Sequence, residues 1–207
     1  MVRAAEVRRR SRARRLSVIS PPGGTPVAVP GGARGPLAIG AQHFKDTLRL
    51  WASGVTVVTV RGPRGVVPIT VSSFASLSLH PPLVLVCIER RARAHRALMR
   101  ARSFGVHLLR ADQADLSDRA AGRRGRAAAR LPRTRARRGV TGAPILEGTL
   151  AWLECTRVAR HRGGDHTIFV GRVEEAGTAT GRPLLWFDRD YAVLSRPVRA
   201  RRRRPRL

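Results

Sequence analysis

Short runs rich in Val, Ile and Thr follow one another along this chain, and each is closed by Gly or Pro. Such runs, bounded by turn-forming residues, are typical of β-strands. They cover residues 55–60, 69–79, 82–88, 104–109, 150–162, 166–177 and 183–194. The turns around Gly62-Pro63-Arg64-Gly65 and Gly163-Gly164 lie at hairpin spacing. Since strand and helix do not alternate regularly, the pattern favours an antiparallel sheet or small barrel over a doubly wound sheet.

Three segments between these runs have the pattern of short helices. Residues 43–51 place Phe44, Leu48 and Trp51 at helical spacing, with Gly54 as a candidate C-cap. Residues 92–102 also look helical, and a third segment, 111–120, opens with acids that suit a helix N-terminus. The expected fold class is therefore mainly β, with about seven strands and a few flanking helices.

The net charge of +28 comes almost wholly from arginine, with 40 Arg and a single Lys against 13 acids. Half of this excess lies in residues 1–40 and 196–207, which are rich in Arg, Pro and Gly and lack any strand or helix period. We expect both to be disordered tails, and interpret them as sequence drift or an extended gene start rather than nucleic-acid arms. Residues 119–139 are predicted to be a basic, exposed loop within one folded domain, 41–195.

The hydrophobic content of 43% is enough for a real core, and Cys87 and Cys155 both lie in apolar runs, as buried free thiols do. Two cysteines cannot form a disulfide framework or a metal cluster by themselves. The sequence has no stretch of the roughly 18 apolar residues that a membrane helix needs, and no apolar run follows the N-terminal arginines as in a signal peptide. We therefore expect a cytoplasmic protein without a metal or a membrane partner.

Conventional catalytic motifs such as GxxxxGK[ST], GxGxxG, HExxH and GxSxG are absent from the sequence. Five hydroxyl residues crowd between Thr70 and Ser78, and in one regular strand Thr70, Ser72, Ser76 and Ser78 would share a face. This row indicates either a ligand with many hydrogen-bonding groups or a solvent-facing strand. Similarly, Asp165 next to His166 indicates either a histidine poised to donate a hydrogen bond or proton, or an ordinary turn.

Taken together and in order, these segments resemble the flavin reductase-like family. The resemblance covers about residues 41–194 and rests on GVTVVT, ITVSSFASLSLHPPLVLVCIERRAR, SFGVHLL, LSDRAA, TGAPILEGTLAWLECTRV, GDHTIFVGRV and PLLWFDRDYAVL. It implies an FMN-binding split β-barrel and a homodimeric NAD(P)H:flavin oxidoreductase that reduces FMN or FAD. It also implies a separate flavin-dependent monooxygenase that receives the reduced flavin.

The resemblance also implies a set of site residues. The T-x-S-S-x-x-S stretch, which contacts the flavin ring and ribityl chain in the family, is matched by Thr70, Val71, Ser72, Ser73 and Ser76. The loop that approaches the flavin phosphate is matched by Cys87, Glu89, Arg90, Arg91 and Arg93. His166 matches the histidine beside flavin and nicotinamide, and is the predicted catalytic residue.

Several positions depart from the family pattern. Ala92 and Ala94 stand where the family commonly has Ser and Thr, so arginines and backbone amides would have to bind the phosphate. Pro68-Ile69 replaces Gly-Met, and His107 replaces an Asn. These changes and the basic loop leave open a noncatalytic or weakly active flavin-binding relative. A third hypothesis, a nucleic-acid-binding protein, rests on the arginine runs but lacks a set of aromatic residues for stacking.

Overall fold

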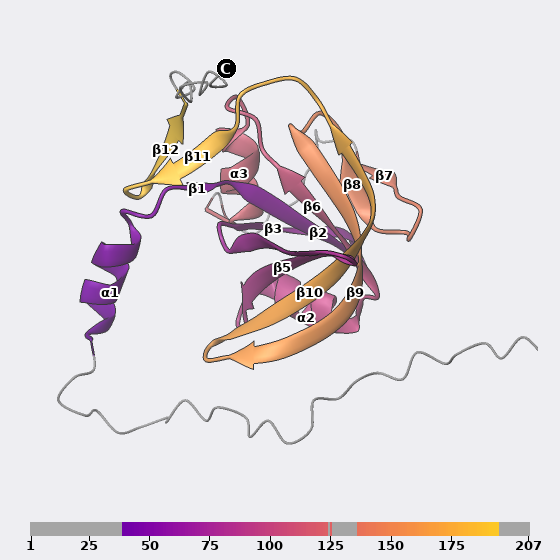
Figure 1. Ribbon diagram of the computed structural model, residues 1–207, viewed down its shortest axis with the longest axis horizontal. Helices are drawn as coiled ribbons and strands as arrows, with labels where there is room; N and C mark the ends of the chain where they lie inside the picture. The colour runs from indigo at the N-terminus through magenta and orange to yellow at the C-terminus, as the bar shows by residue number, and fades with distance from the viewer. Residues whose placement is uncertain (1–38, 124, 126–135, 195–207) are drawn as a thin grey trace, which may run out of the picture. The chain divides into compact units, whose positions relative to one another are not determined.

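The computed structural model describes residues 39–123, 125 and 136–194 (Figure 1), and the tails predicted at 1–40 and 196–207 lie almost wholly outside them. The helices are α1 (Ala41–Leu48), α2 (Arg93–Arg100) and α3 (Ala114–Ala120). The strands are β1 (Ser53–Gly54), β2 (Thr56–Gly62), β3 (Gly65–Val71), β4 (Phe74–Leu79), β5 (Pro82–Glu89), β6 (Ser103–Leu108), β7 (Ala136–Arg138), β8 (Pro144–Leu146), β9 (Ala151–Gly163), β10 (His166–Thr178), β11 (Leu184–Phe187) and β12 (Asp190–Val193). The prediction of a mainly β chain with short helices is confirmed.

The central element is a seven-stranded antiparallel sheet in the order β3-β2-β6-β9-β10-β5-β4. Its two edge strands, β3 and β4, are consecutive in the chain, with only Ser72 and Ser73 between them. Two residues cannot span an open sheet of seven strands, which lie about 4.8 Å apart. The sheet must therefore curl until β3 and β4 approach each other at this corner (Figure 1). Since these two edges are not paired in a ladder with one another, the result is a split barrel.

The break at Ser72 corrects the prediction of one continuous strand over 69–79. Thr70 ends up in β3, on one edge of the sheet, whereas Ser76 lies in β4 on the other edge. The ladder between β4 and β5 is also irregular between Ser76 and Ser78. The expected single face of hydroxyl groups is therefore wrong, because the chain changes its pairing partner in the middle of the row.

Both predicted hairpins form where glycine allows a tight turn. Between β2 and β3, Gly62 pairs with Gly65, whose φ is +108°. Between β9 and β10, Gly163 pairs with His166 and Gly164 has a φ of +59°. Glycine adopts such positive φ values without the steric cost of a Cβ. The long β9–β10 hairpin places the Asp165-His166 pair at its tip (Figure 1).

The barrel interior is a core of aliphatic and aromatic side chains. Its buried members are Val58, Val60, Val84, Val86, Ile88, Leu98, Phe104, Val106, Cys155 and Phe169. A second core of Val55, Val57, Leu109, Leu116, Ala120, Leu146 and Leu184 lies beneath α3. Cys87 and Cys155 are both free thiols, but only Cys155 is buried as expected, whereas Cys87 is half-buried. Burial raises the pKa of the Cys155 thiol to about 12, so it stays protonated and packs as an apolar group.

Two buried polar side chains hold residues 140–146, which include β8, against the sheet. His107 of β6 has Nδ1 2.9 Å from the carbonyl oxygen of Val57, and it accepts a hydrogen bond from the backbone N–H of Leu146. Glu154 of β9 is fully buried, and its carboxylate accepts hydrogen bonds from the backbone N–H groups of Val140 and Thr141. Each side chain satisfies groups that the sheet ladders leave unpaired.

The segment 183–194, predicted as one strand, is a hairpin of β11 and β12. Its turn residues Asp188 and Arg189 have φ values of 49° and 67°, as a two-residue type I′ turn requires. Ion pairs join this turn to α1, with Arg49 3.3 Å from Asp188 and Arg189 2.6 Å from Asp46. The β11 strand also pairs with β1.

The helices lie close to their predicted positions. The first ends at Leu48 with Arg49 as its C-cap, so the prediction of Gly54 in that role is wrong, and Gly54 lies in β1 instead. Of the predicted basic loop, Arg119 and Ala120 close α3 and residues 136–138 form β7, while 124 and 126–135 lie outside the described residues.

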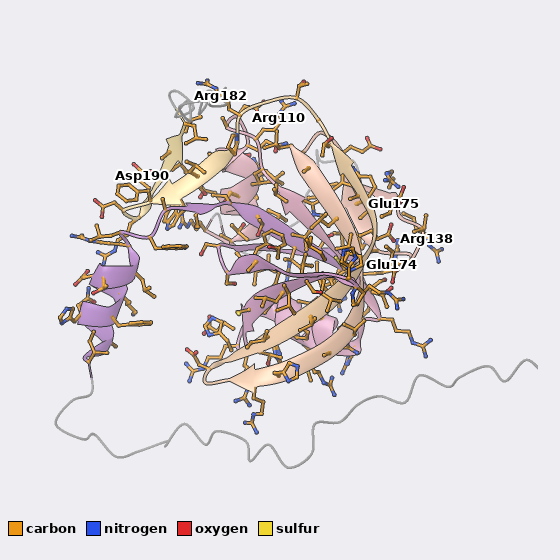
Figure 2. The ribbon with its side chains drawn as sticks, viewed as in Figure 1. Arg110, Arg138, Glu174, Glu175, Arg182 and Asp190 are labelled. Atoms are coloured by element: carbon orange, nitrogen blue, oxygen red, sulfur yellow. The ribbon has the colours of Figure 1, made fainter. Side chains whose placement is uncertain are left out.

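Beyond β6 the chain turns at Arg110, which forms an isolated antiparallel bridge with Pro183 and lies beside Arg182 (Figure 2).

No helix within the described ranges is long and apolar enough to cross a membrane. The same residues contain no group of three or more His, Cys, Asp or Glu side chains that could hold a metal ion.

Candidate functional site

A large pocket of about 1120 Å³ lies between α2, the loop that precedes it, β3 and the end of α3. Its walls are formed by Pro68, Ile69, Thr70, Glu89, Arg90, Arg91, Ala92, Arg93, Ala94, His95, Arg96, Met99, Arg100, Ala120, Ala121, Gly122 and Gly125. We call it the arginine pocket. Five of the predicted site residues, Thr70, Glu89, Arg90, Arg91 and Arg93, lie in its wall.

The pocket is strongly cationic. It contains five arginines, including Arg96 and Arg100 of α2, and Glu89 is the single acid among its described lining residues. Within the described part of the chain, no ion pair joins any of these five guanidinium groups to a carboxylate. Ala92, the residue before α2, gives the helix no side-chain cap. Guanidinium groups and free helix-start N–H groups are donors suited to phosphate oxygens.

His95 also lines the pocket, and the sequence reasoning missed it. Its Nε2 lies 2.9 Å from Oγ1 of Thr167, the neighbour of His166, and its ring meets Phe169 edge to face. Desolvation, together with the charge of Arg90, lowers the pKa of His95. The only sequence signal was a histidine in the first turn of a helix that follows a basic loop.

A smaller pocket of about 190 Å³ adjoins the first, because Thr70 and Ala121 line both. Its other lining residues are Val55, Val71, Ser72, Ser117, Arg123, Trp186 and Tyr191. The rings of Trp186 and Tyr191 meet edge to face at 5.1 Å, and the guanidinium of Arg123 lies 4.9 Å from the Trp186 ring centre. We call it the aromatic pocket. Neither aromatic residue was among the predicted site residues.

Some of the predicted hydroxyl residues line the pockets, whereas others form hydrogen bonds within the fold. Thr70 lines both pockets, but its hydroxyl donates to the carbonyl oxygen of Ser117 at 2.6 Å. Ser73 donates to the carbonyl oxygen of Cys87 at 2.7 Å and so closes the barrel corner. Ser72 is exposed at the aromatic pocket, whereas Ser76 is exposed on β4 and lines neither pocket.

Cys87 and His166 lie outside both pockets. The backbone of Cys87 is bonded to Ser73, and burial raises the pKa of its thiol. His166 stands opposite Glu89 in the β5–β10 ladder, and its Nδ1 is 2.7 Å from the Asp165 carboxylate. Because the backbone N–H of Arg90 donates to the carbonyl oxygen of Asp165, this pair lies at the rim of the arginine pocket.

This architecture matches that of known proteins over most of the chain. The family model described as "Flavin reductase like domain" matches residues 48–195. Among solved structures, the flavin reductase of styrene monooxygenase from Pseudomonas putida S12 superimposes with a TM-score of 0.67 at 34% identity. That match covers 75% of this chain and 99% of the other.

Named relatives are similar at the sequence level. The NADH-dependent FMN reductase SmoA of Agrobacterium fabrum is 42% identical over 170 residues, which are 82% of this chain and 92% of the relative. The reductase component of 4-hydroxyphenylacetate 3-monooxygenase from Thermus thermophilus is 40% identical over 157 residues, or 75% and 98% of the two chains. With the split barrel, the two adjoining pockets and these matches, the chain belongs to the flavin reductase-like family.

Proposed function

We propose that this protein is an NADH-dependent flavin reductase whose arginine pocket binds the phosphate of a flavin nucleotide. The observation that carries the proposal is a cationic pocket that adjoins an aromatic one, within the fold of a flavin reductase. A flavin nucleotide has the matching polarity, because one end is a phosphate and the other a planar aromatic ring. The names of the relatives support NADH as the reductant.

The residues present fit the phosphate group. Arg90 and Arg91 belong to the exposed loop before α2, and Arg93 begins that helix, so the three present their guanidinium groups to the pocket from adjacent positions. Charge-assisted hydrogen bonds of this kind replace the Ser and Thr hydroxyls that Ala92 and Ala94 lack. The substituted phosphate loop therefore remains competent to bind an anion.

The protein's role in the reaction is to bind and orient. When bound, the nicotinamide nucleotide supplies a hydride and the flavin accepts it. The arginines fix the anionic end of the flavin, and Ser72 with the backbone around Val71 borders the aromatic pocket. His166, oriented by Asp165 at the rim, serves as the hydrogen-bond donor near the reacting groups and is the proposed catalytic residue.

The reduced flavin is proposed to pass to a separate flavin-dependent monooxygenase, as in the systems after which several relatives are named.

We also propose a homodimer. Large apolar side chains are exposed on α1, just after it and on β4, among them Phe44, Leu48, Trp51 and Leu79. A contiguous interface that covers them would bury surface that is unfavourable in water. Sedimentation should then give twice the chain mass, and a monomer at micromolar concentration would refute the dimer.

The function is tested by NADH oxidation with FMN, FAD or riboflavin as acceptor. In the double variant Arg90→Gln/Arg91→Gln we expect the KM for FMN to rise at least tenfold, since each lost charge-assisted bond contributes about 1.5 kcal/mol or more. The KM for riboflavin, which lacks the phosphate, should stay within twofold. Arg61→Gln, an exposed arginine on β2, is the matched control.

Two results would contradict the proposal in different ways. Wild-type protein that neither binds flavin nor oxidises NADH in its presence would exclude a flavin reductase. Protein that binds flavin but gives no NADH or NADPH turnover would identify the noncatalytic relative instead. A fall in turnover for His166→Asn, with an unchanged KM for FMN, would support the role of His166.

A further inference from the structure

The cationic wall of the arginine pocket extends well beyond the start of α2. Arg93, Arg96 and Arg100 all line the pocket and are spaced at i, i+3 and i+7, which places them on one face of the helix. At 1.5 Å per residue, this row is about 10 Å long. A single phosphate bound near Arg90 and Arg93 would not reach its far end.

The orientation of this row is fixed by the core. Ala94 and Leu98 lie on the other side of α2, with 2% and 1% of their surface exposed, and Leu98 belongs to the core of the barrel interior. The helix contacts β2, β3 and β5. At the end of the helix, Arg157 donates to the carbonyl oxygens of Leu98 and Met99 at 2.7 and 2.9 Å. The helix therefore cannot rotate to move Arg96 and Arg100 away from the pocket without loss of these contacts.

Within the described residues, the arginines of this row lack the ion pairs that six arginines elsewhere form. Elsewhere Arg49, Arg110, Arg119, Arg123, Arg172 and Arg189 each form an ion pair with a nearby carboxylate. In the residues that the structure describes, neither Arg96 nor Arg100 has such a partner, and the two repel one another across one turn of helix. An anionic ligand would relieve this repulsion.

We propose that Arg96 and Arg100 form a second anion-binding subsite, which takes a phosphate group beyond the one bound at Arg90 to Arg93. This inference rests on the proposed function. It assigns the far end of the pocket to the second half of a dinucleotide. That half comes from one of two sources: FAD, whose second phosphate continues from the first, or the nicotinamide dinucleotide.

The test compares the binding of mononucleotide and dinucleotides by titration calorimetry. In Arg96→Gln/Arg100→Gln, the Kd for FMN should stay within twofold, while the Kd for at least one dinucleotide rises tenfold or more. A rise confined to FAD identifies the flavin as the source, and a rise confined to NADH or NADPH identifies the nicotinamide nucleotide. Arg102→Gln is the matched control, because this exposed arginine lies just beyond α2 and outside the pocket wall.

Two outcomes overturn the subsite. If the Kd values for FMN and for all dinucleotides rise equally, the two arginines contribute only to the general positive potential of the pocket. If no Kd changes, Arg96 and Arg100 are exposed to solvent and bind no nucleotide. The single variants Arg96→Gln and Arg100→Gln, checked by circular dichroism, give the same comparison if the double variant fails to fold. Failure of the proposed function is distinct, since wild-type protein would then bind no flavin at all.

Discussion

Nε2 of His107 lies 2.9 Å from the backbone nitrogen of Leu146, inside a fully buried environment. The backbone N–H can only donate, so Nε2 must be the acceptor and Nδ1 must carry the proton that is donated to Val57. The imidazole is therefore neutral in the folded protein. Burial lowers the pKa of His107 to about 4, and the bond to Val57 offsets only part of this effect.

This geometry predicts a stability that depends on pH. Because the folded pKa is about 4 and the unfolded pKa about 6.5, the unfolded chain binds more protons in this window. The stability contribution is complete above pH 6.5 and is lost as pH falls toward 4, by about 3 kcal/mol at 1.36 kcal/mol per unit. Urea unfolding at pH 7 and pH 4 should show this loss in the wild type but not in His107→Asn. Equal losses in both proteins would refute the assignment.

The buried carboxylate of Glu154 should be essential to the loop before β8. It accepts from the backbone N–H groups of Val140 and Thr141 and from the Thr141 hydroxyl. In Glu154→Gln, one acceptor oxygen is replaced by an NH₂ group that faces donors, which should cost about 2 to 4 kcal/mol in the free energy of unfolding. Glu147→Gln, on the exposed surface, is the control and should change it by less than about 0.5 kcal/mol.

The β11–β12 turn carries a conformational cost at Arg189, whose φ of 67° is unfavourable for a residue with a Cβ. Both Arg189→Gly and Arg189→Ala remove the ion pair with Asp46. Only the glycine variant also removes the steric cost that a Cβ imposes at this positive φ. The glycine variant should therefore be about 1 kcal/mol more stable than the alanine variant in thermal unfolding. Equal melting temperatures would show that the turn is unstrained.

Gly171 of β10 is required by close packing. A Cβ at this position would lie 2.6 Å from Cζ of Phe104 and 2.8 Å from Cβ of Cys155, in the barrel core. Gly171→Ala should destabilise the protein by about 1 to 3 kcal/mol through overpacking. Gly54→Ala provides the comparison, because a Cβ at this position would meet no atom within 4 Å. A similar loss of stability in Gly54→Ala would show that close packing at Gly171 is not the cause.

The two exposed serines of the hydroxyl row should differ in flavin binding. Ser72 borders the aromatic pocket, whereas Ser76 lies on β4 away from both pockets. Loss of one hydrogen bond contributes about 0.5 to 1.5 kcal/mol, so Ser72→Ala should raise the Kd for FMN roughly 2- to 12-fold. Ser76→Ala should leave it unchanged. A similar rise in the Kd for both variants, measured by fluorescence quenching, would favour the family correspondence over the geometry of this chain.

The sequence predicted the fold best where local chemistry decides it. The β2–β3 and β9–β10 hairpins were predictable because Gly65 and Gly164 provide the positive φ that their turns need. The breaks at Ser72 and Asp188 were missed because neither contains Gly or Pro. These breaks depend on which strand the chain pairs with next, and that is a long-range property.

The candidate site was predictable only in part, for a similar reason. Arg90, Arg91 and Arg93 are contiguous and follow a strand, so the basic loop was visible in the sequence. His95, Trp186 and Tyr191 reach the pockets from α2, β11 and β12, and only the tertiary fold brings these elements near Thr70. His166 was predicted from the resemblance, and its catalytic role stays a prediction.

The two-residue link at Ser72 and Ser73 also limits how the barrel can move. A chain of this length spans about 10 Å at most, so β3 and β4 cannot part at this corner while each keeps its ladder. The two edges can therefore separate only toward their far ends, at Gly65 of β3 and Leu79 of β4. Thr70 lies next to the link and would be displaced less than the rest of β3, which holds in place the wall that the two pockets share.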